Sequence, residues 1–458
     1  LSGVLQARLD RLGVFERASL QRASVVGRVF WDSAVKALSP EMQAQEARLD
    51  ESLAILRSKE LIFSSPDSTF PGAQEYAFKH ALLRDVAYET VLKRHRQQYH
   101  ALVAEWLSKA SGERRGEYLS VIADHYEKAG DNDRAVAVLL EAGERALNLS
   151  AFDEAFRFFQ RAQPLIHPRQ TRDLAHIHLK IGEAFYRSGE FADSVKSTEK
   201  ALGLARELSS SILLASCLGQ LGQLYVDMGD YERAEKTLRQ ALPMARAAGI
   251  PARPTLARVL YGLGNVHWRL GNLENARACC EESRDIAREI GDTNTLLLAL
   301  NRLGVVMGAL GNPSAEENYY RQALSLAVSV GNRERAAVAL NNLGALADEK
   351  GDLAKAQGFY LQAIDMAREI GAQQSLALYL INLGHSEIRL GQLDEAANHL
   401  REGLALAEHL GASPWAVTAV LFYARLFHAR GEIERAYSLL GLARNQPAFS
   451  SDHTRLME

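Results

Sequence analysis

Three clusters in the sequence carry side chains that could do chemistry, but none has the spacing of a catalytic or metal site. The Gly-rich stretch Gly112–Gly116 lacks the Lys that follows the second Gly of a phosphate-binding loop. His176 and His178 are two residues apart, so on a helix their side chains point to different faces. The adjacent Cys279 and Cys280 lack the spacing of paired zinc ligands. We therefore predict no catalytic residues, no metal site and no cofactor in this chain, and we expect that it is not an enzyme.

A glycine followed by a polar residue recurs through the second part of the chain. The seven glycines are separated by 40 residues except for one interval of 42, and they are Gly189, Gly229, Gly271, Gly311, Gly351, Gly391 and Gly431. Another Gly follows five of them at a distance of 20 residues, for example Gly249 after Gly229. The residues between these glycines have apolar positions at helical spacing, and Gly is the usual residue just past a helix end. The pattern predicts seven helix–turn–helix hairpins from about residue 171 to 445.

Small residues at fixed distances from the turn glycine identify the kind of hairpin. The residues seven positions before the turn are Gly182, Gly222, Gly264, Gly304, Gly344, Gly384 and Ala424. Alanine also recurs five and twelve positions after the turn, as at Ala356 and Ala363. This combination resembles the tetratricopeptide repeat, which implies an all-α superhelical solenoid. The period is 40 rather than about 34 residues, and Gly replaces the usual Pro between repeats.

Other helical repeats share some of these features. The run Asn341-Asn342-Leu343 before a small residue is similar to the longer repeats of kinesin light chains. HEAT and armadillo repeats have a similar length, but they would not place Gly-Asp in every hairpin. The tetratricopeptide interpretation is therefore favoured.

In a tetratricopeptide superhelix the first helix of each hairpin lines the concave groove, which implies that residues ten, six and three before the turn glycine face it. The side chains at these positions that suit a partner are Tyr186, Gln223, Tyr261, Asn265, Trp268, Asn301, Asn341, Asp348, His385, Arg425 and His428. Asn can hydrogen-bond a peptide backbone as donor and acceptor, and Trp and Tyr supply apolar anchors. The alternative is that these residues only adjust the packing of the solenoid. We predict a protein, peptide or small effector in the groove; no Lys/Arg cluster supports capture of a free carboxyl terminus.

The first 110 residues lack the 40-residue period and are expected to form a separate module. Helical patterns cover 4–12, 16–26 and 46–59, and short strands follow at 61–64 and 76–78. Three helices followed by a β-hairpin is the order of a winged-helix module, which can bind DNA through its third helix. That helix carries charges of both signs, so nucleic-acid binding is not expected. Residues 111–168 are predicted to form an irregular helical lead-in, followed by the repeats at 169–446 and a tail at 447–458.

The run Phe78–Tyr88 resembles the end of the winged-helix subdomain of STAND signal-transduction ATPases. It is similar to the Met-His-Asp-Leu run of plant immune receptors, with Lys79 and Ala81 departing from the first and third positions. In that family the His at the position of His80 contacts a phosphate of bound ADP and helps to hold the closed state. The resemblance implies that His80 senses nucleotide in the full-length protein; the alternative is a helix cap.

The opening segments 5–12 and 23–27 resemble the region that follows the ATPase core in bacterial predicted ATPases. Such ATPases often accompany adenylate/guanylate cyclase or protein kinase domains. This resemblance implies an ATPase core upstream of Leu1, with ATP or ADP as a cofactor of the longer protein.

The charge balance limits the partners of the protein. Its 53 Lys and Arg nearly match its 56 Asp and Glu, so no global field draws nucleic acid or an anionic membrane. Three cysteines do not make a disulfide framework, and apolar runs are far shorter than a membrane span, so we expect a cytoplasmic protein. The leading hypothesis is the sensor or scaffold region of a signal-transduction ATPase. A peptide-responsive winged-helix transcription regulator and a constitutive assembly scaffold are the alternatives.

Overall fold

The computed structural model describes residues 2–38, 46–149, 151–167, 169–410 and 413–445 and is almost entirely helical over them. The protein forms two compact units, Leu1–Leu224 and Tyr225–Glu458. The boundary falls within a helix of the predicted repeat array, and the predicted tail at 447–458 lies outside the described residues. Among the described helices, none combines the length and the apolarity that a membrane span requires.

The N-terminal module combines short helices with one small sheet. Its elements are α1 (Ser2–Asp10), α2 (Val14–Val26), β1 (Val29–Trp31), α3 (Asp32–Ala37), α5 (Glu46–Ser58), β2 (Ile62–Ser64), β3 (Glu75–Phe78), α6 (Ala81–Glu89) and α7 (Lys93–Ala110). The strands are antiparallel in the order β1-β3-β2, so the predicted two-stranded wing is wrong by one strand. The extra strand forms because Phe30 packs against Phe78 in the core, with ring centroids 5.4 Å apart.

Helices α7 to α10 connect this module to the repeats. The helices after α7 are α8 (Arg115–Ala129), α9 (Asn132–Asn148) and α10 (Phe152–Ala162), and each packs against the next. Gly143 allows α9 and α10 to approach closely, because a Cβ atom there would lie 2.3 Å from the ring of Phe159. These three helices lie where the sequence predicts the lead-in.

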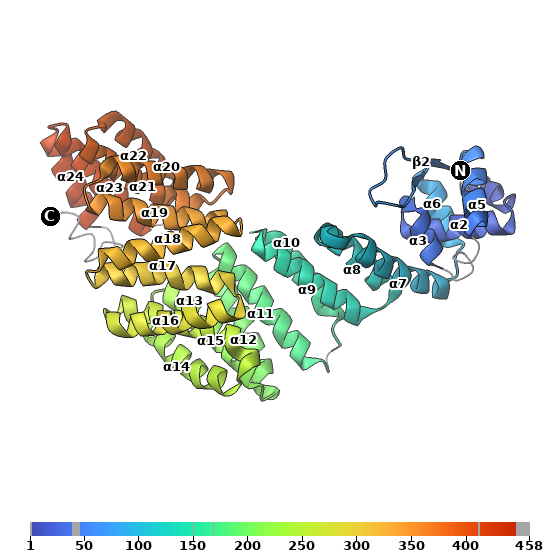
Figure 1. Ribbon diagram of the computed structural model, residues 1–458, viewed down its shortest axis with the longest axis horizontal. Helices are drawn as coiled ribbons and strands as arrows, with labels where there is room; N and C mark the ends of the chain where they lie inside the picture. Colours follow the sequence, from blue (N-terminus) through green and yellow to red (C-terminus); the bar gives the residue numbers. More distant parts are fainter. Residues whose placement is uncertain (1, 39–45, 150, 168, 411–412, 446–458) are drawn as a thin grey trace. The chain divides into compact units, whose positions relative to one another are not determined.

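Seven helical hairpins follow, as the glycine period predicts (Figure 1). The first helices are α11 (Thr171–Ser188), α13 (Ser211–Asp227), α15 (Arg253–Arg269), α17 (Thr293–Ala309), α19 (Arg333–Glu349), α21 (Gln373–Leu390) and α23 (Ser413–Ala429). The second helices are α12 (Phe191–Glu207), α14 (Tyr231–Ala247), α16 (Leu273–Ile290), α18 (Pro313–Ser329), α20 (Leu353–Glu369), α22 (Leu393–His409) and α24 (Ile433–Arg444). The predicted fold class, an all-α array of repeated hairpins after a small module with a sheet, is confirmed.

The residue pattern of each turn has a direct backbone cause. All seven turn glycines have φ between 74° and 87°, a conformation that other residues rarely adopt. The polar residue that follows often caps the next helix; Asp230, for example, accepts a hydrogen bond of 3.1 Å from the amide of Arg233. The glycine seven residues before the turn lets the two helices touch, since a Cβ at Gly304 would lie 2.3 Å from the ring of Tyr320. The residues that mark the hairpins in the sequence are thus those that form the turns and allow the helices to approach closely.

Candidate partner-binding face

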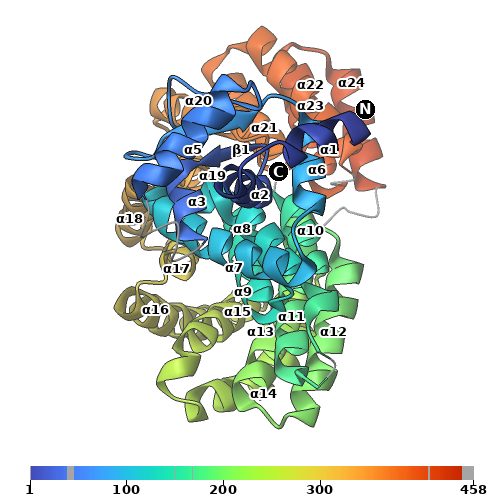
Figure 2. The ribbon, with the colours of Figure 1, turned by 90° about the vertical axis from the view of Figure 1, so that its right-hand side faces the viewer.

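The predicted partner-binding residues lie on the first helices of the hairpins. In the second unit, each first helix packs against the second helix of its own hairpin and against that of the preceding hairpin. The helices α15/α16 to α23/α24 follow one another in this way (Figures 1 and 2). We define the first-helix face of this unit as Tyr261, Asn265, Trp268, Asn301, Val305, Gly308, Asn341, Ala345, Asp348, Ile381, His385, Ile388, Leu421, Arg425 and His428. Tyr186 on α11 and Gln223 on α13 belong to the first unit and are half-buried.

Asparagines join three consecutive first helices. The Nδ2 of Asn342 on α19 donates to Oδ1 of Asn301 on α17 at 2.6 Å, and the Nδ2 of Asn382 on α21 donates to Oδ1 of Asn341 at 2.9 Å. Asn341 also donates to Asn342 at 3.3 Å and is buried. The amide of Asn341 is therefore engaged in holding neighbouring repeats in register. Asn342 and Asn382 were not predicted, although each stands before Leu-Gly at the same distance from its turn.

The ring of Trp268 contacts two arginines. The guanidinium carbon of Arg302 on α17 is 4.3 Å from the centroid of the Trp268 ring, and that of Arg269 is 4.5 Å away. One turn earlier on α15, Asn265 is buried and its Oδ1 has no hydrogen-bond partner among the described residues. Trp268 was predicted to be an apolar anchor; the structure places charged groups over its ring.

Asp348, His385 and Arg425 meet across α19, α21 and α23. The Nδ1 of His385 lies 3.6 Å from Oδ2 of Asp348, and its Nε2 lies 3.1 Å from Nη1 of Arg425. Arg425 can only donate, so Nε2 accepts and the ring proton of His385 faces Asp348. Arg389, which was not predicted, donates to the carboxylate of Asp348 at 2.8 Å. Burial lowers the pKa of His385 to about 4, aided by Arg425 and Arg389 and opposed by Asp348, so His385 is neutral at pH 7.

His428, unlike the residues of this cluster, is exposed, and it lies near the end of α23. Tyr261 is half-buried on α15. The structure thus brings together two groups of predicted residues, one around Trp268 and one around His385. Within the described residues, no three His, Cys, Asp or Glu side chains are placed to hold a metal ion.

His80 occupies the position just before α6 in the first unit. It is exposed, and its backbone carbonyl accepts from the amide of Leu83 at 3.1 Å, but its side chain makes no capping hydrogen bond. The side chain of His80 therefore lies at the free amino end of a helix, where an anion is favoured.

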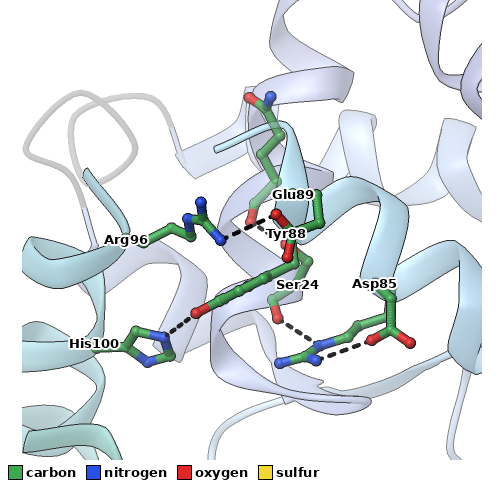
Figure 3. A network of polar contacts seen from close by, with 8 residues as sticks. Ser24, Asp85, Tyr88, Glu89, Arg96 and His100 are labelled. Carbon is green, nitrogen blue, oxygen red and sulfur yellow. Dashed lines mark hydrogen bonds and ion pairs between the residues drawn. The ribbon is translucent and has the colours of Figure 1, made fainter. Parts of the chain in front are cut away.

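A polar network that the sequence did not indicate joins the module to α8. Figure 3 shows the hydroxyl of Tyr88 directed at His100, with Nε2 at 2.9 Å. The Nδ1 of His100 lies 2.8 Å from the Nδ1 of His125 on α8. His100 thus joins Tyr88 and His125 in one chain of hydrogen bonds. Arg84 and Arg96 cover the Tyr88 ring, each about 5 Å from its centroid.

The two histidines of this network are neutral at pH 7. Burial lowers the pKa of His100 to about 3 and that of His125 to about 4. Lys128 and Arg84 act in the same direction on both rings, whereas Asp124 opposes the shift of His125. No sequence motif links these positions, because they come together only when α7 packs against α8.

Comparison with family models identifies the repeats. A model described as MalT-like TPR region matches residues 291–448, and two tetratricopeptide repeat models match residues 173–247 and 220–289. The hairpins are tetratricopeptide repeats.

An uncharacterised protein of Rhizobium meliloti is 26% identical over 175 residues, which are 38% of this chain and 16% of that protein. The 43 kDa receptor-associated protein of the synapse from Tetronarce californica is 26% identical over 176 residues, 37% of this chain and 42% of that protein. The matched stretch spans less than half the length of these curated relatives.

Solved structures share the fold over longer stretches. A STAND protein with a tetratricopeptide repeat sensor from Pyrococcus horikoshii superposes with a TM-score of 0.69 at 16% identity, covering 97% of this chain and 64% of that one. The apo form of the quorum sensor NprR from B. thuringiensis has a TM-score of 0.51 at 13% identity and covers 82% of this chain and 97% of its own. At sequence identities of 16% and 13%, these comparisons show that the fold is shared.

Proposed function

We propose that this protein is the sensor region of a longer signal-transduction ATPase and that its first-helix face binds a peptide or protein segment. The observation that carries the proposal is the alignment of polar and aromatic groups across consecutive first helices. The asparagine contacts between α17, α19 and α21 keep these helices in register, and the buried carbonyl oxygen of Asn265 accepts no hydrogen bond from the residues that the structure describes. An extended segment laid across the helices would supply the missing donor.

The link to an ATPase is supported by the extent of the fold likeness. The likeness to the STAND protein covers 97% of this chain, so it includes the N-terminal module and the lead-in as well as the repeats. We propose an ATPase core preceding Leu1, ATP or ADP as its nucleotide, and a cytoplasmic location. The exposed side chain of His80 at the start of α6 would contact a phosphate of that nucleotide.

The longer protein tests this link. The full-length His80→Ala variant is expected to retain less ADP after purification and to shift towards the open, active form, because one contact that favours the closed state is removed. Released nucleotide, quantified by chromatography, and the rate of ATP hydrolysis are the measurements. Lys79→Ala is the matched control, since Lys79 is also exposed and pairs with Glu60. Unchanged ADP retention and rate in His80→Ala would reduce His80 to a structural residue.

A peptide-responsive regulator is the second candidate function, favoured by the fold likeness to a quorum sensor. Its winged helix would bind DNA through α5, whose side chains carry both signs of charge. Specific retention of promoter fragments by the full-length protein would select this candidate over the ATPase.

A further inference from the structure

Arg269 and Arg302 of the first helices lack the carboxylate partners that most other arginines of the same unit have. Arg333 pairs with Glu369 at 2.5 Å within one hairpin, and Arg368 pairs with Glu402 of the next repeat at 2.9 Å. Arg302 and Arg269 form no ion pair or hydrogen bond with any described residue; the ring of Trp268 is the contact they share. Two positive charges are thus left without a counter-ion at one place.

Trp268 fixes the positions of these charges. The ring contacts come from two different repeats, because Arg302 is on α17 whereas Trp268 and Arg269 are on α15. A guanidinium stacked on an aromatic ring is preorganised, so little freedom is lost when its N–H groups bind a planar anion. The Nε of Arg302 is buried and has no partner in the described part of the chain, which strengthens the attraction for a negative charge near it.

Asn265 supplies a second unsatisfied group one turn away. It is 3% exposed, so it is more than nine-tenths buried, and its Oδ1 accepts no hydrogen bond within the described part of the chain. Buried polar groups are normally paired, and this acceptor lies one helical turn from the ring that holds both guanidinium groups, so one ligand could complete all three. A peptide residue has a backbone N–H for the acceptor, and an acidic one also has a carboxylate for the guanidinium groups.

We infer that Arg302 and Arg269, held by Trp268, bind the carboxylate of an Asp or Glu side chain in the partner segment, while Asn265 accepts from its backbone. The inference rests on the proposed function and names its partner class: an acidic peptide segment. A polyanion such as single-stranded nucleic acid is not favoured, because the carboxylate of Asp348 lies further along the same face.

The test is a selection of random dodecapeptides, amidated at the C-terminus, on the whole protein and on the variants Arg302→Gln, Arg302→Lys and Arg269→Gln. The wild type should enrich peptides with Asp or Glu in one register, and the enrichment should disappear with Arg302→Gln and persist in part with Arg302→Lys. A selected peptide should lose about tenfold in affinity when its acidic residue is changed to the amide, and Arg302→Gln should bind both peptides equally. Arg277→Gln on α16 removes the same charge outside the face and should retain the preference.

The outcomes separate the inference from the proposed function. Selected peptides without acidic residues, or an acidic preference that survives Arg302→Gln and Arg269→Gln, would overturn the inference and leave peptide binding intact. Failure to select any peptide would contradict both. Tighter binding of a fluorescein-labelled dT12 oligonucleotide than of the selected peptides would also overturn the inference. Circular dichroism of each variant establishes that the fold is retained.

Discussion

The buried pair of His100 and His125 makes the junction between α7 and α8 sensitive to acid. Their side chains lie almost out of contact with solvent, and their pKa values are about 3 and 4 in the folded protein. In the unfolded protein both should titrate near the ordinary value of about 6.5. On acidification the unfolded state therefore takes up protons first, and stability falls.

The size of the effect follows from the shift at His125. Its contribution is fully present above pH 6.5 and is lost as the pH falls towards 4. Between pH 7.5 and 5.0 the unfolded state gains nearly one proton at this site and the folded state gains almost none. Integrating over that interval gives a loss of about 2 kcal/mol. His100 should add to this loss, since its pKa is lowered in the same direction.

Hydrogen exchange of the whole protein measures this loss at the site. The free energy of opening for amides of α7 and α8 is obtained at pH 7.5 and 5.0 after correction for the intrinsic exchange rate. We expect it to fall by about 2 kcal/mol or more in the wild type and by clearly less in His125→Gln, which keeps a polar side chain but does not titrate. Amides of α19 and α20, which lie in the other unit, serve as the internal control. The same fall in wild type and variant would refute the assignment.

Three changes in the repeats test packing, the asparagine contacts and the surface ion pairs. Gly304→Ala should destabilise the protein by about 1–3 kcal/mol in urea unfolding, because the added Cβ would lie 2.3 Å from Tyr320. Gly358→Ala is the control, since a Cβ at Gly358 would have nothing within 4 Å, and it should not destabilise the protein. Equal effects of the two substitutions would contradict the close approach of the helices at Gly304. Asn342→Ala should cost about 1 kcal/mol in thermal unfolding by removing the bond to α17, and an unchanged melting temperature would mean that this contact does not hold the repeats. Arg368→Gln should cost about 1 kcal/mol or less, and the cost should vanish at high salt because the ion pair is exposed; a cost that salt does not change would be evidence against screening.

The repeat architecture could be predicted because its cause is local. Each turn requires a glycine with positive φ, and most helix contacts require a glycine as well. These glycines therefore recur in the sequence with the period of the repeat. The strand β1 was missed because Val29–Trp31 is only three residues long and is recruited by the aromatic packing of Phe30. The helices of the repeats could thus be predicted from periodic residues, whereas β1 depends on a tertiary contact that the sequence does not show.

The sequence predicted which positions belong to the candidate site, but it did not predict which side chains contact one another there. Spacing from the turn placed Trp268 and His385 on the correct helices, yet it could not show that Arg302 lies over one ring or that Arg425 lies beside the other. These contacts depend on long side chains that reach across from the next repeat. The pairing of His100 with His125 could not be predicted because it depends on the packing of α7 against α8.

Titration calorimetry with a display-selected peptide tests the central claim, that the first-helix face is the recognition surface. Wild type, Trp268→Ala and Arg277→Ala are compared, the last being a change on α16 outside the face. We predict that Trp268→Ala weakens binding by about 2 kcal/mol or more, because the ring positions both unpaired arginines, and that Arg277→Ala binds like the wild type. Equal affinities for the two variants would contradict the claim.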